Sequence, residues 1–218
     1  MTTPPVQKCL VVVPMKDPNL SKTRLRGRLK DEQRKALAQL LFKRTLKTLL
    51  QARDSTQAVL FDLAVVTDST DAAAIATAHD VTVIEEGPTH SLSRAVDTAA
   101  QWAAKNGYDA ICMFPADLAA PDPEDIRRFV QAGLQHGGGL LCPSTDMGTN
   151  ALFLSPPTAI PFSFGINSAN SHMTAIEQAG LLPRLLPLES LRFDIDTVDC
   201  LEKSLGQVPE VSNLLAQT

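Results

Sequence analysis

Short, continuous apolar runs alternate with helical segments along almost the whole chain, and this alternation limits the possible folds more than any other feature. Uninterrupted apolar runs are typical of strands that are covered on both faces. The predicted strands lie at 8–14, 59–67, 81–85, 110–116, 139–143, 150–155 and 192–196. The predicted helices lie at 31–53, 71–79, 91–105, 123–134, 169–179 and 198–205. This order predicts an α/β fold, a three-layer αβα sandwich around a mainly parallel central sheet.

Length and composition favour one ordinary globular core. With 218 residues, 44% apolar and 20% charged, residues 1–218 are expected to form a single domain. No apolar stretch approaches the roughly 20 residues that span a bilayer, and residues 1–7 are too polar for a secretory signal. We therefore expect a cytoplasmic protein without a membrane partner.

A group of cations follows the first predicted strand. Lys16, Lys22 and Arg24 come directly after the apolar run 10–14. Sheets of this type bind ligands beyond the carboxyl ends of their strands. Positive charge fixed at such a place suits a nucleoside triphosphate, so phosphate chemistry is the first hypothesis. The motifs GxxxxGK[ST] and GxGxxG are both missing from the sequence, which argues against a P-loop or a dinucleotide loop.

The surrounding segment is strongly basic, and this leaves nucleic-acid binding as an alternative. Residues 16–53 hold 12 of the 20 Lys and Arg but only three acids, a net charge of +9, against −13 for the remainder. Apolar residues such as Leu37, Leu41 and Leu49 indicate an amphipathic helix, whose cations are interpreted as a solvated outer face. The acidic remainder, with one Trp and one Tyr, disfavours a nucleic-acid partner.

Three carboxylates end two predicted strands. Asp117 follows the apolar run 110–116, where a lone carboxylate needs a partner. Asp194 and Asp196 end the strand predicted at 192–196, and strand alternation would send both side chains to one face. Mg²⁺ takes a few hard oxygen ligands from protein and leaves its other positions to water and phosphate. We predict Mg²⁺ at Asp117, Asp194 and Asp196; the alternative is that Asp194 or Asp196 caps the helix that begins near Val198.

Two further loops suit an anionic small molecule. Residues 148–150 and 165–168 offer hydroxyls and closely approaching backbone N–H groups, notably at Thr149, Gly165 and Ser168. Ser168 also precedes a predicted helix, whose N-terminus favours negative charge. Ordinary turn chemistry would explain either loop taken alone.

Together these segments resemble the CofC/FbiD family, the guanylyltransferases of coenzyme F420 biosynthesis, within the nucleotidyltransferases of GT-A-like fold. The resemblance rests on five segments in order: Val13-Pro14-Met15-Lys16 with Ser21-Lys22-Thr23-Arg24-Leu25; Pro115-Ala116-Asp117-Leu118; Gly148-Thr149-Asn150-Ala151-Leu152; Phe164-Gly165-Ile166-Asn167-Ser168 with His172; and Asp194-Ile195-Asp196-Thr197. Three positions depart from the family pattern: Ala119 replaces a proline, Ile166-Asn167 replaces Pro-Gly or Pro-Asp, and Ser93 stands where Asn is usual.

The resemblance implies a role for each candidate residue. Asp117, Asp194 and Asp196 would hold Mg²⁺, and Thr149, Gly165 and Ser168 would bind a small phosphorylated carboxylic acid. Lys16, Lys22 and Arg24 would contact the phosphates of GTP and, with Asp117, carry catalysis; Ser93 would lie on the GTP side. The phosphate of the acid would attack the α-phosphorus of GTP and release pyrophosphate.

The resemblance leaves the acid open among phosphoenolpyruvate, 2-phospho-L-lactate and 3-phospho-D-glycerate, with the first two preferred. A homodimer and a downstream transferase of the F420 pathway are further candidate partners. Three rival functions stay open at this point. The chain could be a sugar or molybdopterin nucleotidyltransferase, a glycosyltransferase that uses residues 194–196 as a DxD motif, or a non-catalytic nucleotide-binding or nucleic-acid-binding module.

Overall fold

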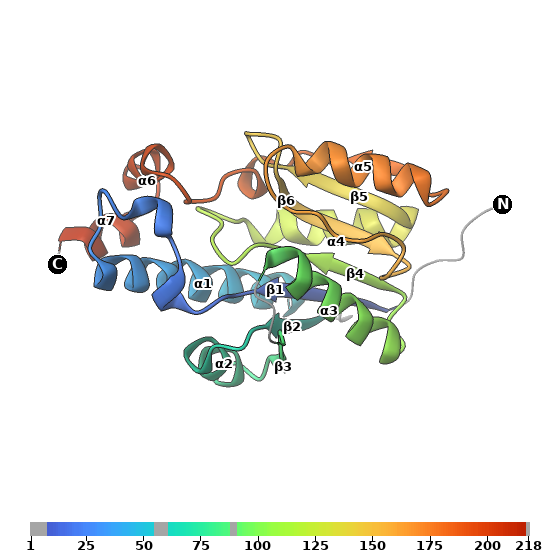
Figure 1. Cartoon of the computed structure of the whole chain (residues 1–218), viewed down its shortest axis with the longest axis horizontal. Coiled ribbons are helices and arrows are strands. Elements are labelled where there is room, and N and C mark those ends of the chain that lie inside the picture. The colour runs from blue at the N-terminus through green and yellow to red at the C-terminus, as the bar shows by residue number, and fades with distance from the viewer. Residues whose placement is uncertain (1–7, 55–60, 88–90, 217–218) are drawn as a thin grey trace.

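The computed structural model describes residues 8–54, 61–87 and 91–216, and its centre is a seven-stranded sheet in the order β3-β2-β1-β4-β6-β5-β7 (Figure 1). The strands are β1 (Cys9–Pro14), β2 (Asp62–Val66), β3 (Thr82–Ile84), β4 (Ala110–Met113), β5 (Gly138–Pro143), β6 (Thr149–Ser155) and β7 (Pro183–Leu185). The helices are α1 (Asp31–Asp54), α2 (Thr70–Thr77), α3 (Leu92–Lys105), α4 (Pro123–His136), α5 (Ser168–Gln178), α6 (Val198–Leu205) and α7 (Pro209–Ala216). Short 3₁₀ helices are η1 (Pro18–Leu20), η2 (Thr23–Leu25) and η3 (Glu189–Leu191).

The sheet is mainly parallel, as predicted. Strand β6 alone among the described strands runs antiparallel, to both of its neighbours β4 and β5. It does so because residues 144–148 join β5 to β6 as a hairpin, with Ser144 N–H donating to the Gly148 carbonyl. The remaining pairs, β1 with β2 and β4, β2 with β3, and β5 with β7, are parallel. The predicted α/β sandwich is confirmed.

Both faces of the sheet are buried, which explains the continuous apolar runs. Along β1, Val11 and Val13 pack into one cluster with side chains of α1, α2 and α4, whereas Leu10 and Val12 pack into another with α3 and α5. Alternate residues of one strand thus enter opposite layers. A third cluster joins α6 and α7 to the outer side of α1 through Leu201, Val208 and Val211.

Several predicted boundaries need correction. Residues 192–196 do not form a strand: only Asp194 makes a bridge, to Leu118, and η3 comes directly before them. The short strand β7 and the helix α7 were not predicted. Positions 59 and 60 of one predicted strand, and residues 1–7, lie outside the described residues.

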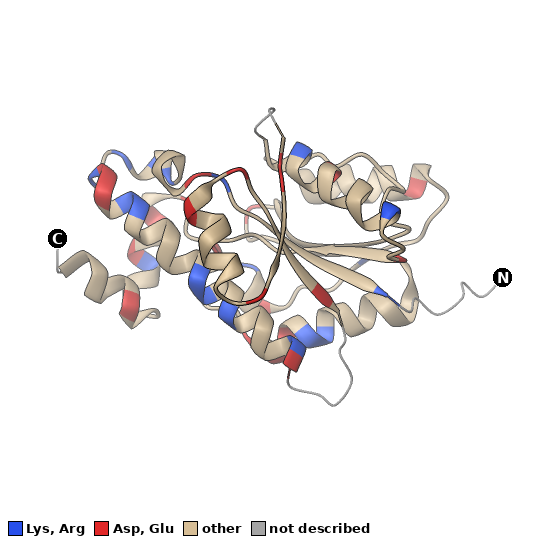
Figure 2. Ribbon diagram, turned by 90° about the horizontal axis from the view of Figure 1, so that it is seen from below, with Lys and Arg blue, Asp and Glu red and all other residues tan. Residues whose placement is uncertain are grey.

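The basic segment lies mostly along α1, where Figure 2 shows Lys and Arg spread over the helix. Lys43 and Lys47 are exposed, and Lys35 pairs with Asp71 at 3.1 Å. These three lysines support the interpretation of the helix cations as a solvated face, whereas Arg34 of the same helix is buried and departs from it. Among the described helices, none combines the length and the apolar character that crossing a bilayer requires.

Candidate active site

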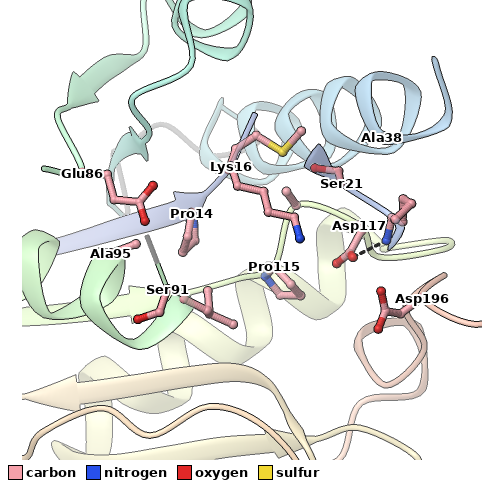
Figure 3. A pocket seen from close by; sticks show the side chains of 14 residues that line it. Pro14, Lys16, Ser21, Ala38, Glu86, Ser91, Ala95, Pro115, Asp117 and Asp196 are labelled. Carbon is pink, nitrogen blue, oxygen red and sulfur yellow. Dashed lines mark hydrogen bonds and ion pairs between the residues drawn. The ribbon is translucent and has the colours of Figure 1, made fainter. Parts of the chain in front are cut away.

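A cleft of about 320 Å³ opens beyond the carboxyl ends of β1, β3 and β4 (Figure 3). Lys16, Asp117 and Asp196 lie toward one end of it, and Glu86 and Ser91 lie toward the other. The sheet order explains the separation, because β3 and β4 are three positions apart. This is the place where a parallel sheet is expected to bind its ligand.

The loop after β1 is held in a defined shape by its own hydrogen bonds. The Asp17 carboxylate accepts from the Asn19 N–H at 2.8 Å and so caps η1, and the Ser21 hydroxyl donates to the Asp17 carbonyl at 3.0 Å. Lys22 follows with a left-handed backbone, φ 55°, a conformation that non-glycine residues adopt only where the surroundings fix it. The cations are therefore carried on a rigid turn.

Lys22 joins three distant segments. Its side chain is 4% exposed, and its ammonium donates to the Asp117 carboxylate and, at 2.6 Å, to the Ile195 carbonyl. A buried cation needs such partners. The structure therefore brings Lys22 and Asp117 together as predicted, but as a direct ion pair. Lys16, by contrast, is exposed on the cleft wall.

Asp194 lies against Asp117 in an unfavourable electrostatic setting. Burial, followed by the negative charge of Asp117, raises the pKa of the Asp194 carboxyl from 3.8 to about 6. The Asn150 amide donates to it at 3.2 Å and partly offsets this rise. Asp196 lies nearer to solvent and accepts from Arg24 at 2.8 Å. The three carboxylates thus occupy one region, with Lys22 and Arg24 beside them.

The aspartates do not cap α6. Thr197 is the N-cap, because its hydroxyl accepts from the Cys200 N–H at 3.2 Å. The capping alternative for Asp194 and Asp196 is therefore wrong. Among the described residues, no group of three or more His, Cys, Asp or Glu side chains is arranged so that it could hold a metal ion. A site with one or two carboxylates and several remaining positions fits this arrangement, and it is the type that Mg²⁺ uses with phosphate substrates.

Thr149, Ser168 and His172 form a buried hydrogen-bonded chain. The Thr149 hydroxyl lies 2.9 Å from the Ser168 hydroxyl and 3.1 Å from Nδ1 of His172. The Ser163 N–H donates to Nε2 of His172 at 3.1 Å. Nε2 must therefore be unprotonated, so Nδ1 carries the proton and donates to Thr149. Burial lowers the pKa of His172 from 6.5 to about 4, which keeps the imidazole neutral at physiological pH.

The loop that carries Gly165 packs against this chain. Gly165 has φ 138° and accepts from the Ser168 N–H at 3.2 Å. The Ser93 hydroxyl accepts from the Phe164 N–H at 3.0 Å, so Ser93 ties α3 to this loop. None of these residues lines the cleft; Asn150, which follows Thr149, donates to Asp194, two residues before the cleft residue Asp196. Their predicted contacts with substrate stay predictions.

Three residues with structural prominence were not singled out from the sequence. Arg34 looks like one more cation of α1, yet it is 2% exposed and donates to the Ser21 carbonyl at 3.0 Å. Asn150 was quoted only as part of a motif, and Glu86 belongs to no motif. Only burial and tertiary contact distinguish these side chains from their neighbours.

Comparison with known proteins agrees with this geometry. Residues 9–205 match the family model described as "Guanylyl transferase CofC like". The 3-phospho-D-glycerate guanylyltransferase of Colwellia psychrerythraea is 38% identical over 192 residues, which cover 88% of this chain and 89% of that protein. This chain belongs to the CofC-like guanylyltransferase family.

A further relative supports the assignment to the CofC-like guanylyltransferases. The phosphoenolpyruvate guanylyltransferase of Sphaerobacter thermophilus is 31% identical over 92% of this chain and 94% of its own length. Among solved structures, one from Desulfovibrio desulfuricans described as a nucleotide-diphospho-sugar transferase superposes with a TM-score of 0.70. At 18% identity, with 96% of this chain and 97% of that chain covered, it supports the GT-A-like fold alone.

Proposed function

We propose that this CofC-like guanylyltransferase transfers GMP from GTP to the phosphate of a small phosphorylated carboxylic acid, with release of pyrophosphate, in coenzyme F420 biosynthesis. The observation that carries the proposal is the contact of Lys22 with Asp117 and the Ile195 carbonyl. This contact gathers the cationic loop and the carboxylates at one end of the cleft. Family membership supplies the class of reaction.

The acceptor needs no general base. A phosphate monoester has a second pKa near 6, so at neutral pH it is mostly a dianion and already a nucleophile. The obstacle to the reaction is electrostatic repulsion, because the phosphate of the acid and the triphosphate of GTP are both anions and must approach each other in line. Lys16, exposed in the cleft, and Arg24, exposed and paired with the cleft residue Asp196, would offset the negative charge of the triphosphate. Lys22 would hold Asp117 in orientation.

One or two of the carboxylates of Asp117, Asp194 and Asp196 would hold Mg²⁺ at this end of the cleft. When bound, the ion supplies charge neutralisation for the triphosphate and the departing pyrophosphate. The raised pKa of Asp194 supports this assignment, since a carboxylate that is burdened by burial and by Asp117 gains most from a neighbouring cation.

The acid is proposed by class. Relatives carry the names 3-phospho-D-glycerate guanylyltransferase, at 38% identity, and phosphoenolpyruvate guanylyltransferase, at 31% identity. The hydroxyls of Thr149 and Ser168, with the backbone of Gly165, are the proposed contacts for it. Because the candidate acids differ by a few atoms, the panel tested must contain 3-phospho-D-glycerate, phosphoenolpyruvate and 2-phospho-L-lactate.

The direct test is pyrophosphate release with GTP, CTP and ATP against these three acids, with Mg²⁺ or with EDTA. We expect turnover with GTP and one acid that requires Mg²⁺. Release without any acid, or with CTP or ATP alone, would contradict the proposal.

We also propose a cytoplasmic homodimer that passes its product to a downstream transferase of the pathway; light scattering tests the dimer.

Asp117→Asn should lower kcat by orders of magnitude while the far-ultraviolet circular dichroism stays unchanged. The variant removes a charge that pairs with Lys22 and would hold Mg²⁺, without removing bulk. Asp199→Asn is the matched control, because Asp199 is exposed and lies three residues beyond Asp196. Near-normal turnover of Asp117→Asn at saturating Mg²⁺ would refute the assignment.

A further inference from the structure

Glu86 is a buried carboxylate at the end of the cleft away from the Lys22–Asp117 pair (Figure 3). It comes two residues after β3, is 7% exposed and lines the cleft together with Ser91 and Ala95 of the opposite wall. Its carbonyl accepts from the Thr98 hydroxyl at 3.4 Å, which ties the segment to α3. Three strand spacings separate the ends of β3 and β4, roughly 14 Å.

The charges along the cleft assign its two ends. A triphosphate belongs beside Lys16 and Lys22, and a buried carboxylate such as Glu86 would repel it. The part of a nucleotide that extends from the phosphates toward Glu86 is therefore the ribose and the base. Pro14 lies between the two ends in Figure 3, and Leu92 and Ala95 are further apolar residues of the lining. Apolar side chains of this kind suit the faces of a base.

We propose that Glu86 is the specificity-determining residue that reads the base, by accepting from N1–H and the exocyclic amino group of guanine. This inference rests on the proposed function and adds the residue that selects GTP. Guanine presents two adjacent donors on this edge, and a carboxylate accepts such a pair as it accepts the fork of an arginine. Adenine and cytosine carry an acceptor nitrogen where guanine has N1–H. That nitrogen would face the Glu86 carboxylate, which would then lack one of its two hydrogen bonds.

The test is calorimetric titration with GTP, ITP and ATP in the presence of Mg²⁺ and without any acid. ITP keeps N1–H but lacks the amino group, so it removes one of the two bonds. Glu86→Gln preserves shape and replaces one acceptor oxygen by a donor. Glu85→Gln is the matched control, since Glu85 is the exposed neighbour on the same segment. Thermal melting checks that both variants are folded.

We expect the wild-type protein to bind GTP about tenfold or more tightly than ITP or ATP, because a bidentate contact discriminates by about 1–3 kcal/mol and 1.4 kcal/mol is tenfold. Glu86→Gln should weaken GTP at least about tenfold, bring GTP and ITP together, and leave ATP unchanged or tighter. Glu85→Gln should shift each affinity less than twofold.

Two results would overturn the inference: a wild-type protein that does not prefer GTP, or a Glu86→Gln variant that weakens all three nucleotides equally or GTP less than twofold. A preference for GTP that depends on Glu86, without pyrophosphate release for any acid, would uphold this inference and remove the proposed function. The two proposals therefore fail separately.

Discussion

At the scale of one residue, Asp194 lowers the stability of the fold while it provides a carboxylate for the proposed Mg²⁺ site. Its carboxyl is buried, faces the charge of Asp117 and has a pKa of about 6 against the usual 3.8. A folded-state pKa above the unfolded value means that the folded protein holds the proton more tightly. The free energy of unfolding therefore falls as pH rises from about 4 to about 6, and the ionised Asp194 carboxylate still destabilises the folded protein at neutral pH.

We predict that Asp194→Asn raises the melting temperature at pH 7 in EDTA. Two pKa units correspond to roughly 3 kcal/mol at most, so we expect the free energy of unfolding at pH 7 to rise by about 1–3 kcal/mol. At pH 4, where the wild-type carboxyl is protonated, the gain should vanish. Added Mg²⁺ and GTP should reverse the order of the two proteins, because only the wild type has the proposed ligand. A variant that is less stable than the wild type in EDTA at pH 7 would contradict this account.

His172 acts on the Thr149 and Ser168 hydroxyls, and its replacement tests the proposed acid-binding loop. His172→Phe keeps the ring beside Phe164, whose centroid lies 4.9 Å away, but removes both hydrogen bonds of the imidazole. We expect the KM for the acid to rise about tenfold, the equivalent of 1.4 kcal/mol, with the KM for GTP nearly unchanged. Steady-state kinetics on both substrates measures the split; an equal rise in both KM values would indicate a general loss of structure. Exposed His79, changed to Phe, is the control.

The individual residues differ in how far sequence could place them. Asp117 was predictable because a charged residue at the end of an apolar strand needs a partner. The pairing of Lys22 with Asp117 was not, since a loop lysine can reach solvent, a phosphate or a carboxylate with equal ease. Glu86 carries no local pattern, and its position depends on the order of β3, β2, β1 and β4 in the sheet.

At the scale of elements, α1 supports the cationic loop through Arg34. The guanidinium donates to the Ser21 carbonyl and to Asp31, and Nε has no hydrogen-bond partner within the part of the chain that the structure describes. The loop before α1 therefore rests on a buried cation of the helix itself. Lys22, the next residue after Ser21, takes its position from this support.

We predict that Arg34→Met destabilises the protein by about 1–3 kcal/mol, because the Ser21 carbonyl and Asp31 lose a buried partner. It should also weaken GTP binding, since the loop that carries Lys22 loses its support. Lys47→Met is the matched control: Lys47 is exposed on the same helix, and a change within about 0.5 kcal/mol is expected. Chemical denaturation and GTP titration measure both effects. Equal behaviour of the two variants would contradict the role of Arg34.

Element boundaries failed where tertiary contacts decide the conformation. Residues 192–196 have a strand-like composition, yet only Asp194 finds a partner, Leu118, so the segment makes one bridge and no ladder. β7 begins with Pro183 and has three residues, too few for a periodic signal. The helix α7 is stabilised by Val208 and Val211 packing on α1, a contact that no local window contains. Long segments such as α3 and α4 were predictable because their periodicity extends over several turns.

At the scale of the whole molecule, the cleft is built from segments that span most of the chain. This predicts that nucleotide binding stabilises the protein as one unit. With GTP and Mg²⁺ at about 100 times the Kd, the gain is about 2.7 kcal/mol, or about 5–10 °C for a chain of this size. A single calorimetric transition should move by that amount. A second transition that does not move would contradict the prediction that residues 1–218 form one domain.

The ammonium of Lys22 contacts the Ile195 carbonyl across 173 positions of sequence. During synthesis, the early loop is therefore left without its closing contact until Ile195 has left the ribosome. Catalytic competence should consequently appear last in refolding, after the sheet has formed, and recovery of turnover would report the docking of the segment that carries Ile195.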